Sequence, residues 1–167
     1  MTTALLLSLG GNMGDRRALM DSAVAAIGAL PGTTVVARSA AYRSAADGPV
    51  RQDWYANLAL VVETDMVPEA FIAATRVIEA DLGRDRATEI PWGPRPMDID
   101  VVALGPGPSA RFVAPRPGKL LDTRPFVVIP LAEIAGDVSV GGRTIAAIAA
   151  QSDSGALDRL DWPVVLG

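Results

Sequence analysis

Short apolar runs alternate with stretches of helical spacing along the first hundred residues. The runs at 4–9, 33–42, 54–63 and 98–104 predict strands. Between them, residues 15–30 and 69–82 carry apolar side chains at helical spacing, and Pro31-Gly32 and Gly83 end these two helices. The order strand, helix, strand, strand, helix, strand predicts an α+β fold, a ferredoxin-like βαββαβ sandwich. In it an antiparallel sheet has helices packed on one face.

The remaining residues predict a smaller C-terminal extension on the same single domain, 1–167. Residues 105–118 are rich in Pro and Gly and too irregular for regular structure. A short helix is expected at 125–135, a strand that ends in a turn at 138–142, and a small apolar helix at 144–151. Within the sandwich, Gly10-Gly11-Asn12 predicts a turn after the first strand. The loop at 44–53 is long enough to suggest a binding role.

Composition narrows the classes of function. The net charge is −4 and the pI about 4.8, which argues against a nucleic-acid partner. No apolar run approaches the length of a membrane span, and Met1-Thr2-Thr3 lacks the basic region of a secretory signal. The chain has no Cys and no His, so disulfides, thiol chemistry and the commonest general base are absent. We therefore expect a cytoplasmic monomer that acts on small molecules, with no membrane partner.

Two aspartates lie inside the apolar run at 98–104. On a strand, Asp98 and Asp100 share a face, roughly 6.5 Å apart along the chain, while Ile99 and Val101 point into a core. Two carboxylates on one face repel each other, so a hard cation such as Mg²⁺ is expected between them. Arg95 adds a fork that matches phosphate, and the combination suggests phosphoryl chemistry on a nucleotide. The alternative is a solvated Asp-x-Asp pair on a loop or edge strand, the commoner setting of this short pattern.

The stretch around these aspartates reads Trp92-Gly93-Pro94-Arg95-Pro96-Met97-Asp98-Ile99-Asp100-Val101-Val102. In this pattern, and in further matches, the sequence resembles the 6-hydroxymethyl-7,8-dihydropterin pyrophosphokinase family, over roughly residues 5–140. The further matches are Leu9 to Arg16, Tyr42-Arg43-Ser44, Gly48-Pro49, Tyr55-Ala56-Asn57, Glu63-Thr64, Glu79, Gly83-Arg84, Arg124-Pro125-Phe126 and Ile129 to Ala135.

The resemblance implies transfer of pyrophosphate from ATP to the hydroxymethyl group of the pterin, giving AMP and the pterin diphosphate in folate biosynthesis. It implies that Asp98 and Asp100 ligate two Mg²⁺ ions, and that Arg86 and Arg95 act with them on the phosphates. The residues that it implies around the pterin are Ser44, Ala45, Tyr55, Asn57 and Phe126. Those that it implies around ATP are Arg76, Glu79, Arg84, Arg86, Trp92, Arg95, Val101, Lys119 and Arg124.

The chain also departs from the family pattern. The loop after the fourth strand usually carries a histidine, whereas Gly118 stands here with Lys119 next to it. Arg76 replaces a glutamine that often contacts adenosine, and Asp47 stands where an apolar residue is common. Two other functions therefore stay open: a pterin- or nucleotide-binding module that has lost catalysis, and another Mg-dependent Asp-x-Asp nucleotide transferase. Tyr55 and Phe126 could likewise be ordinary core aromatics.

Overall fold

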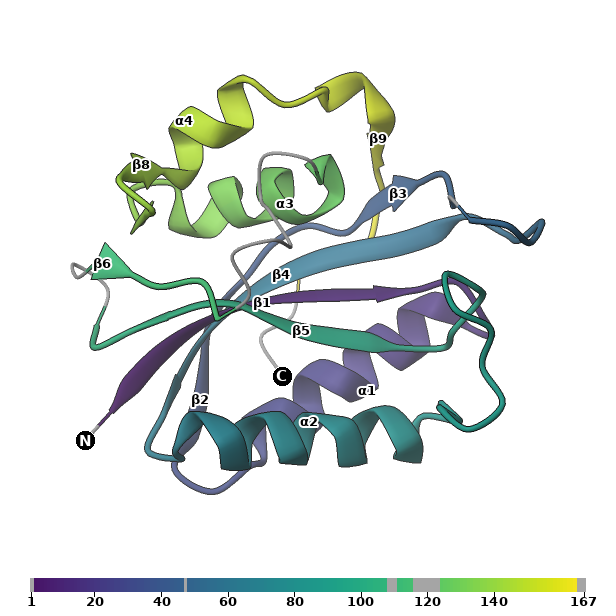
Figure 1. The fold of residues 1–167 in the computed structure, drawn as a ribbon, viewed down its shortest axis with the longest axis horizontal. Helices are drawn as coiled ribbons and strands as arrows, with labels where there is room; N and C mark the ends of the chain where they lie inside the picture. The colour runs from purple at the N-terminus through teal and green to yellow at the C-terminus, as the bar shows by residue number, and fades with distance from the viewer. Residues whose placement is uncertain (1, 47, 108–110, 116–123, 165–167) are drawn as a thin grey trace.

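A six-stranded sheet runs through the centre of the computed structural model, which describes residues 2–46, 48–107, 111–115 and 124–164 (Figure 1). The strand order is β5-β1-β4-β3-β9, and β2 pairs with another part of β4. Every pairing within this sheet is antiparallel. The strands are β1 (Thr3–Gly11), β2 (Thr33–Arg38), β3 (Tyr42–Ser44), β4 (Tyr55–Thr64), β5 (Asp98–Gly105) and β9 (Leu157–Arg159). The predicted ferredoxin-like sandwich is thereby confirmed.

Helices cover both faces of this sheet. The two helices of the sandwich, α1 (Arg16–Gly28) and α2 (Pro68–Asp81), pack on one face as predicted (Figure 1). The helices of the C-terminal part, α3 (Pro125–Ala135) and α4 (Ile145–Ala150), pack on the other. Alternation along β1 serves both layers, because Leu5, Leu7 and Leu9 enter the α1/α2 core while Ala4 and Leu6 enter the α3/α4 core.

Local chemistry explains where the helices begin. Asp15 caps α1, since its side chain accepts a hydrogen bond of 3.1 Å from the backbone N of Ala18. Both α2 and α3 begin at a proline, whose fixed φ suits the first helical turn and whose missing N–H is not needed there. Glu69 follows in the first turn of α2, where a negative charge meets the positive end of the helix dipole.

The structure corrects the predicted elements in three places. Strand β1 continues through Gly10 to Gly11, because both glycines pair with β4, so the predicted turn begins later. The predicted strand 33–42 is broken into β2 and β3. At the break the hydroxyl of Ser39 accepts from the backbone N of Ala59 at 2.8 Å, and a Glu133 carboxylate oxygen accepts from the N of Ala40 at 2.7 Å. Strand β9 was not predicted; it has three residues and forms only by pairing with the edge of β3.

The C-terminal part adds small elements around α3 and α4. A three-stranded sheet contains β6 (Arg111–Phe112), β7 (Ser139–Val140) and β8 (Arg143–Thr144), and a short 3-10 helix, η2, spans Ser154–Ala156. The prediction that residues 105–118 lack regular structure was wrong at β6, which forms by pairing with β7, a strand distant in sequence. The predicted helix at 125–135 is confirmed, and the one at 144–151 appears as α4. Of the helices in the described part of the chain, none has both the length and the apolar character needed to cross a bilayer.

Helix α3 covers only half of its sheet face. Beneath it, Leu6 and Ala59 are completely buried, and Ala103 of β5 joins them. Further along β1, on the same face, Ser8 and Gly10 are only half-buried. The neighbouring residues of β5 on this uncovered half are Asp98 and Asp100, which pair with Gly10 and Ser8. The fold therefore leaves a polar half-face open beside the two aspartates.

Gly11 is a position at which the fold itself requires glycine. A Cβ built there would lie within 2.2 Å of the carbonyl oxygen of Pro96. Because backbone atoms cannot move aside cheaply, we expect Gly11→Ala to lower the free energy of unfolding by about 1–3 kcal/mol or more. Urea unfolding followed by circular dichroism measures this loss. The control is Gly28→Ala at the end of α1, where a Cβ would meet Val35 at an ordinary 3.6 Å. Equal stabilities for the two variants would contradict the prediction.

Candidate active site

The two aspartates lie on the edge strand of the sheet, as the sequence predicted for a strand. Ile99 is 7% exposed in the α1/α2 core and Val101 packs against the same cluster. Asp98 and Asp100 therefore point to the opposite face, and both are half-buried. The strand is an edge strand, which is one of the two settings named in the alternative, but both aspartates are half-buried and not fully solvated.

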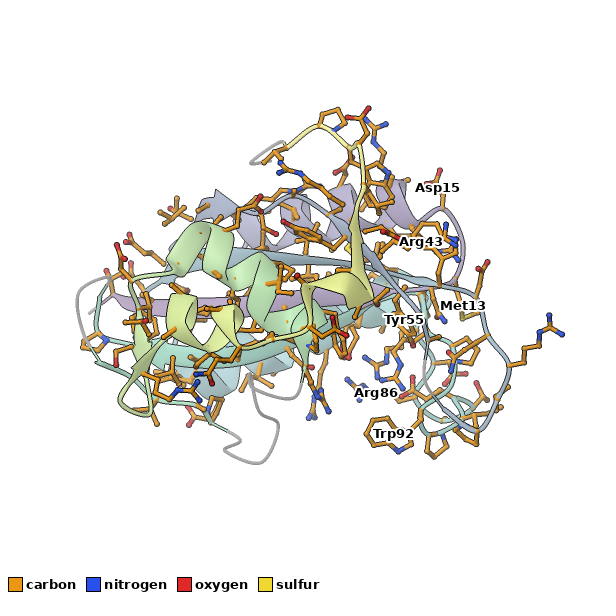
Figure 2. All side chains as sticks on the ribbon, turned by 90° about the horizontal axis from the view of Figure 1, so that it is seen from above. Met13, Asp15, Arg43, Tyr55, Arg86 and Trp92 are labelled. Carbon is orange, nitrogen blue, oxygen red and sulfur yellow. The ribbon has the colours of Figure 1, made fainter. Side chains whose placement is uncertain are left out.

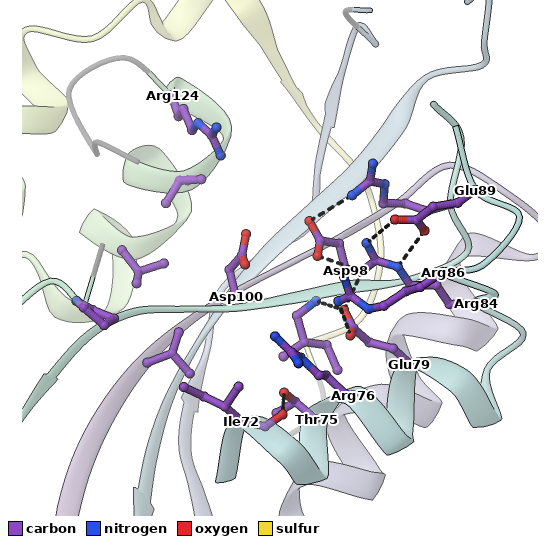
Figure 3. Close-up of a pocket in the computed structure, with 16 residues that line it drawn as sticks. Ile72, Thr75, Arg76, Glu79, Arg84, Arg86, Glu89, Asp98, Asp100 and Arg124 are labelled. Carbon is purple, nitrogen blue, oxygen red and sulfur yellow. Dashed lines mark hydrogen bonds and ion pairs between the residues drawn. The ribbon is translucent and has the colours of Figure 1, made fainter. Parts of the chain in front are cut away.

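A buried guanidinium joins this strand to α2 and to the loop between them. The side chain of Arg84 is 3% exposed. Its Nη1 donates to Glu79 Oε2 at 2.7 Å and to Asp98 Oδ1 at 2.9 Å, while Nε and Nη2 donate to the two oxygens of Glu89, each at 2.9 Å (Figure 3). The fork on Glu89 is bidentate, the strongest arrangement for this pair of groups. Arg84 thus holds one oxygen of Asp98 in a defined position.

Glu79 organises the same region from α2. Its side chain is 2% exposed, and its Oε2 also accepts from the backbone N of Ile99 at 2.9 Å. Its Oε1 accepts from Nη2 of Arg86 at 2.9 Å, and the side chain of Arg86 is 51% exposed. A buried carboxylate is tolerated here because two guanidinium groups and a backbone N–H satisfy it. Glu79 consequently positions Arg86 and the start of β5 together.

The charges in this network shift the pKa values of its members. Hydrogen bonding to Arg84 lowers the pKa of Glu89 below its ordinary value of 4.5. Burial alone would lower the pKa of Arg84, but its bonds to Glu89 and Asp98 raise it well above the ordinary value. Both groups therefore stay ionised at neutral pH, and Arg84 keeps a fixed positive charge beside Asp98.

A cleft of about 440 Å³ surrounds the outer edge of β5 (Figure 3). Among the residues that the structure describes, five arginines and four carboxylates contribute to its lining, so this part of the site is cationic although the whole chain is acidic. Arg76 reaches it from α2 and Arg124 from the start of α3, on opposite sides of the cleft (Figure 3). The predicted site residues that line it are Arg76, Glu79, Arg84, Arg86, Arg95, Asp98, Asp100, Val101 and Arg124.

Of the residues predicted around the pterin, Ser44, Tyr55 and Asn57 lie outside this cleft lining, on the sheet face that also carries Gly10. Sheet register places Asp98, Gly10 and Asn57 side by side on β5, β1 and β4. Two spacings between neighbouring strands separate Asp98 from Asn57, which corresponds to about 9.6 Å. Asn57 is 3% exposed, and its Nδ2 donates to Ser44 Oγ at 2.8 Å and to the carbonyl of Tyr42 at 3.2 Å. Ser44 and Asn57 are thus brought together.

The two predicted stacking aromatics come from different elements. Tyr55 begins β4 on the same face as Asn57, and its hydroxyl donates to the carbonyl of Gly93 at 3.1 Å. Burial raises the pKa of the Tyr55 hydroxyl, so it remains a donor at neutral pH. Phe126 is half-buried near the start of α3 and packs against the α3/α4 core. Its pairing with Tyr55 across a ring stays a prediction, and Ala45 is exposed in the loop that follows β3.

Trp92 is 67% exposed, and its backbone has a φ of +61°, which is strained for a residue other than glycine. Gln52 steadies it, because the side-chain amide donates to the Trp92 carbonyl at 2.8 Å. Tyr55, Arg86 and Trp92 lie at the same end of the molecule (Figure 2). Lys119 lies outside the described residues, as do Gly118 and Asp47, so their predicted parts stay predictions.

Sequence reasoning assigned no role to Asn12 or Glu89. Asn12 is 4% exposed. Its backbone N donates to the carbonyl of Arg95 at 3.0 Å, and its Oδ1 accepts from the backbone N of Arg95 at 3.0 Å. Its Nδ2 donates to the side chain of Gln52 and to the carbonyl of Asp53. It therefore connects the loop after β3 with the loop that carries Arg95. For Glu89, the available signal was an acidic residue five positions after Arg84 in a loop with two arginines. For Asn12, only its place after two glycines marked it.

The donor set of the site fits Mg²⁺ bound together with phosphates. Among the described residues, no group of three or more His, Cys, Asp or Glu side chains could enclose a metal ion. Asp98 and Asp100 offer hard oxygens on one face of a strand, and Mg²⁺ commonly takes one or two carboxylates and completes its shell with water and substrate phosphates. Arg86 and Arg95, which line the same cleft, would meet such phosphates.

Comparison with known proteins agrees with this arrangement. The sequence profile of the 7,8-dihydro-6-hydroxymethylpterin-pyrophosphokinase (HPPK) family matches residues 6–136. The chain belongs to the HPPK family. The 2-amino-4-hydroxy-6-hydroxymethyldihydropteridine pyrophosphokinase of Methylorubrum extorquens is 40% identical over 159 residues, which cover 95% of this chain and 99% of that protein. The protein of the same name from Pseudomonas aeruginosa is 30% identical over 164 residues, which cover 96% and 98%.

Solved structures confirm the HPPK fold. A crystal structure of Plasmodium falciparum HPPK-DHPS with pterin and p-hydroxybenzoate aligns with a TM-score of 0.67 at 12% identity. The alignment covers 90% of this chain and 42% of the Plasmodium chain, so this chain spans less than half of that protein.

The Arg84 network yields a prediction on stability. Removing the buried guanidinium would leave the carboxylates of Glu79 and Glu89 without their main counter-charge, and breaking a buried pair in this way costs about 3–5 kcal/mol. We therefore expect Arg84→Met to destabilise the fold by about this amount. The matched control is Arg86→Met, since that side chain is half exposed and its pair with Glu79 contributes at most about 1 kcal/mol. Chemical denaturation of both variants measures the difference, and equal losses would refute the hub role of Arg84.

A second prediction concerns acid stability. Because the folded pKa of Glu89 lies below 4.5, its ionised form stabilises the fold above that pH, and the contribution is lost as the pH falls through the folded pKa. Glu89→Gln should therefore cost stability at neutral pH, and the difference from the unaltered protein should shrink below pH 4.5. Unfolding free energies from pH 3 to pH 7, in steps of about half a unit, measure this. Glu69→Gln, an exposed glutamate on α2, is the control for loss of charge. A difference that stays constant with pH would contradict the assignment.

Proposed function

We propose that this chain transfers pyrophosphate from ATP to the hydroxymethyl group of 6-hydroxymethyl-7,8-dihydropterin, giving AMP and the pterin diphosphate. The observation that carries the proposal is the junction at β5. There, Asp98 and Asp100 line the cleft that contains the five arginines. Asp98 also stands in register with Gly10 and Asn57 on the neighbouring strands. HPPK membership and the names of the curated relatives support the same reaction.

In this reaction ATP occupies the cleft around the edge of β5. Arg86 and Arg95 bind its phosphates, and Arg76 and Arg124 contact the nucleotide from the two sides. Arg84 has its donors on Glu79, Glu89 and Asp98, so it acts on ATP mainly by holding that carboxylate and the loop. Glu79 and Val101 form the base of the cleft.

The pterin lies over the uncovered half of the α3 face. Tyr55 and Phe126 stack on the ring, an arrangement that contributes on the order of 1 kcal/mol beyond burial. Asn57 anchors the amide-like edge, with Ser44 holding the Asn57 amide and the backbone near Ala45 adding contacts. This placement directs the hydroxymethyl group toward Asp98, since Gly10 separates Asn57 from that residue on the sheet.

Asp98 and Asp100 would hold two Mg²⁺ ions. When bound, these ions neutralise phosphate charge and stabilise the charge that develops during transfer. Arg95 lies close to the carboxylate of Asp98, with 3.9 Å between Arg95 Nη1 and Asp98 Oδ2. The protein side of the site is therefore a set of fixed charges aimed at one point.

The chemical step is a displacement at the β-phosphorus of ATP. The hydroxymethyl oxygen forms a bond to this phosphorus, the bond to the bridging α–β oxygen breaks, AMP leaves, and the hydroxyl proton is released. With no His or Cys in the chain, the proton acceptor is a carboxylate, a phosphate oxygen or water. Catalysis consequently depends mainly on positioning and charge stabilisation.

Product analysis with Mg²⁺, ATP and the hydroxymethyl dihydropterin tests the proposal directly. Formation of AMP and pterin diphosphate in equal amounts supports it. Pterin binding without turnover would instead favour a binding module that has lost catalysis. ADP, or AMP formed without any change of the pterin, would point to another Mg-dependent nucleotide transferase.

The aspartates provide the matching prediction by mutation. Asp98→Ala and Asp100→Ala each remove a hard metal ligand, so we expect kcat to fall by about a thousandfold or more while the far-ultraviolet spectrum stays native. Steady-state production of AMP measures the loss. Asp81→Ala, at an exposed carboxylate at the end of α2, is the control and should keep full activity. Near-normal turnover in either cleft variant would reject the metal assignment.

A further inference from the structure

Gly10 is a glycine in the interior of a central strand. It pairs with Asn57 of β4 on one side and with Asp98 of β5 on the other. Glycine weakens a strand because it has more conformational freedom to lose and offers no side chain for packing. Such a glycine usually marks a bulge, a bend or the close approach of a ligand or another backbone. The pairing of Gly10 is regular on both sides, so a bulge does not explain it.

The fold itself does not require glycine at this position. Gly10 is not among the residues with positive φ, so its backbone conformation is open to any residue. A Cβ there would lie 3.4 Å from Asn57 Oδ1, 3.8 Å from the Ala56 carbonyl and 3.9 Å from Tyr55 Cδ1, all ordinary contacts. Gly11 differs sharply, since a Cβ at that position would collide with the Pro96 carbonyl. The two adjacent glycines therefore have different causes.

The missing side chain of Gly10 would point toward the predicted pterin site. It would extend from the same face as Asp98 and Asn57, on the half that α3 leaves uncovered. Gly10 is only half-buried, whereas Gly11, on the other face, is buried. The only two side chains among the three nearest neighbours of the missing Cβ, those of Asn57 and Tyr55, belong to the residues assigned to the edge and to one face of the ring.

We infer that Gly10 is a substrate-binding position, at which bare backbone lies directly beneath the pterin ring between Asn57 and Asp98. This inference rests on the proposed function. A flat ring can meet the Asn57 amide and the Tyr55 face together only if it sits close to the sheet. A methyl group at Gly10 would lift the ring away from these partners and move the hydroxymethyl group from its position near Asp98. ATP would be unaffected, since its cleft lies around the edge of β5.

The test compares Gly10→Ala with Gly28→Ala and with the unaltered protein. Both substitutions add one methyl group where the backbone and the space allow it, and Gly28 lies on α1, on the other side of the sheet. Calorimetry first measures Mg²⁺-dependent binding of an ATP analogue whose α–β bridge is a methylene group. It then measures binding of 6-hydroxymethyl-7,8-dihydropterin to the protein saturated with that analogue. Thermal unfolding of each protein is recorded in parallel.

We expect Gly10→Ala to keep or raise the melting temperature, to bind the ATP analogue as before, and to bind the pterin about tenfold more weakly or worse. Gly28→Ala should match the unaltered protein in both affinities. Unchanged pterin affinity in Gly10→Ala overturns the inference, as does a clear loss of stability, because the fold would then account for the glycine. If the unaltered protein itself fails to bind the pterin, the proposed function fails, and that result is distinct from either of these.

Discussion

The ionised contact between Arg84 and its three carboxylate partners is the interaction on which the site depends. It connects the end of α2 through Glu79, the following loop through Glu89, and the first residue of β5 through Asp98. A cation this deeply buried is costly unless every donor is satisfied, and here the partners include a bidentate carboxylate. Because the hydrogen bonds between Arg84 and its partners keep these groups ionised in spite of burial, the loop between α2 and β5 is anchored before any substrate arrives. The geometry of Asp98 is therefore a property of the fold.

The incomplete cover of the sheet explains why two substrates can meet at one strand. Helix α3 packs over Leu6, Ala59 and Ala103, whereas Ser8 and Gly10, further along β1 on the same face, are only half-buried. One substrate can then approach the open face, while the other approaches around the outer edge of β5. In the part of the chain that the structure describes, β5 is an end strand of the main sheet and has β1 as its neighbour there. Asp98 and Asp100 occupy the line where the face meets the edge. On an edge strand, two side chains on the same face can contact one ligand that lies over the sheet face and another that lies beside the outer edge.

The sequence was sufficient for the order of the main elements and for the orientation of the aspartates, because both follow from periodicity. Ile99 and Val101 are buried where the alternation predicted it, and α3 occupies the predicted residues. What periodicity could not provide were partners distant in sequence. The bonds from Asn12 to Arg95 and to Asp53 join segments 83 and 41 residues apart, and no local pattern encodes them. Strand β9 was missed for the same reason, since three residues become a strand only when an edge is available.

The predicted roles of the arginines separate once their partners are known. Composition alone did not distinguish the arginines from one another, and the resemblance assigned five of them to ATP, of which Arg86 and Arg95 were assigned to its phosphates. In the structure Arg84 is committed to three carboxylates at 3% exposure, and Arg86 shares Glu79 with it while remaining half exposed. Arg95 has a long contact of 3.9 Å with Asp98 and a long hydrogen bond of 3.5 Å from its Nε to the Gly93 carbonyl, so it can turn to a phosphate at small cost. An ion pair that is short and buried serves best as a scaffold, whereas one that is long and partly solvated serves best as a ligand for a substrate. The cleft contains both kinds. The buried pair with Arg84 holds the carboxylate of Asp98, and Arg86 and Arg95 can direct the phosphates toward that carboxylate.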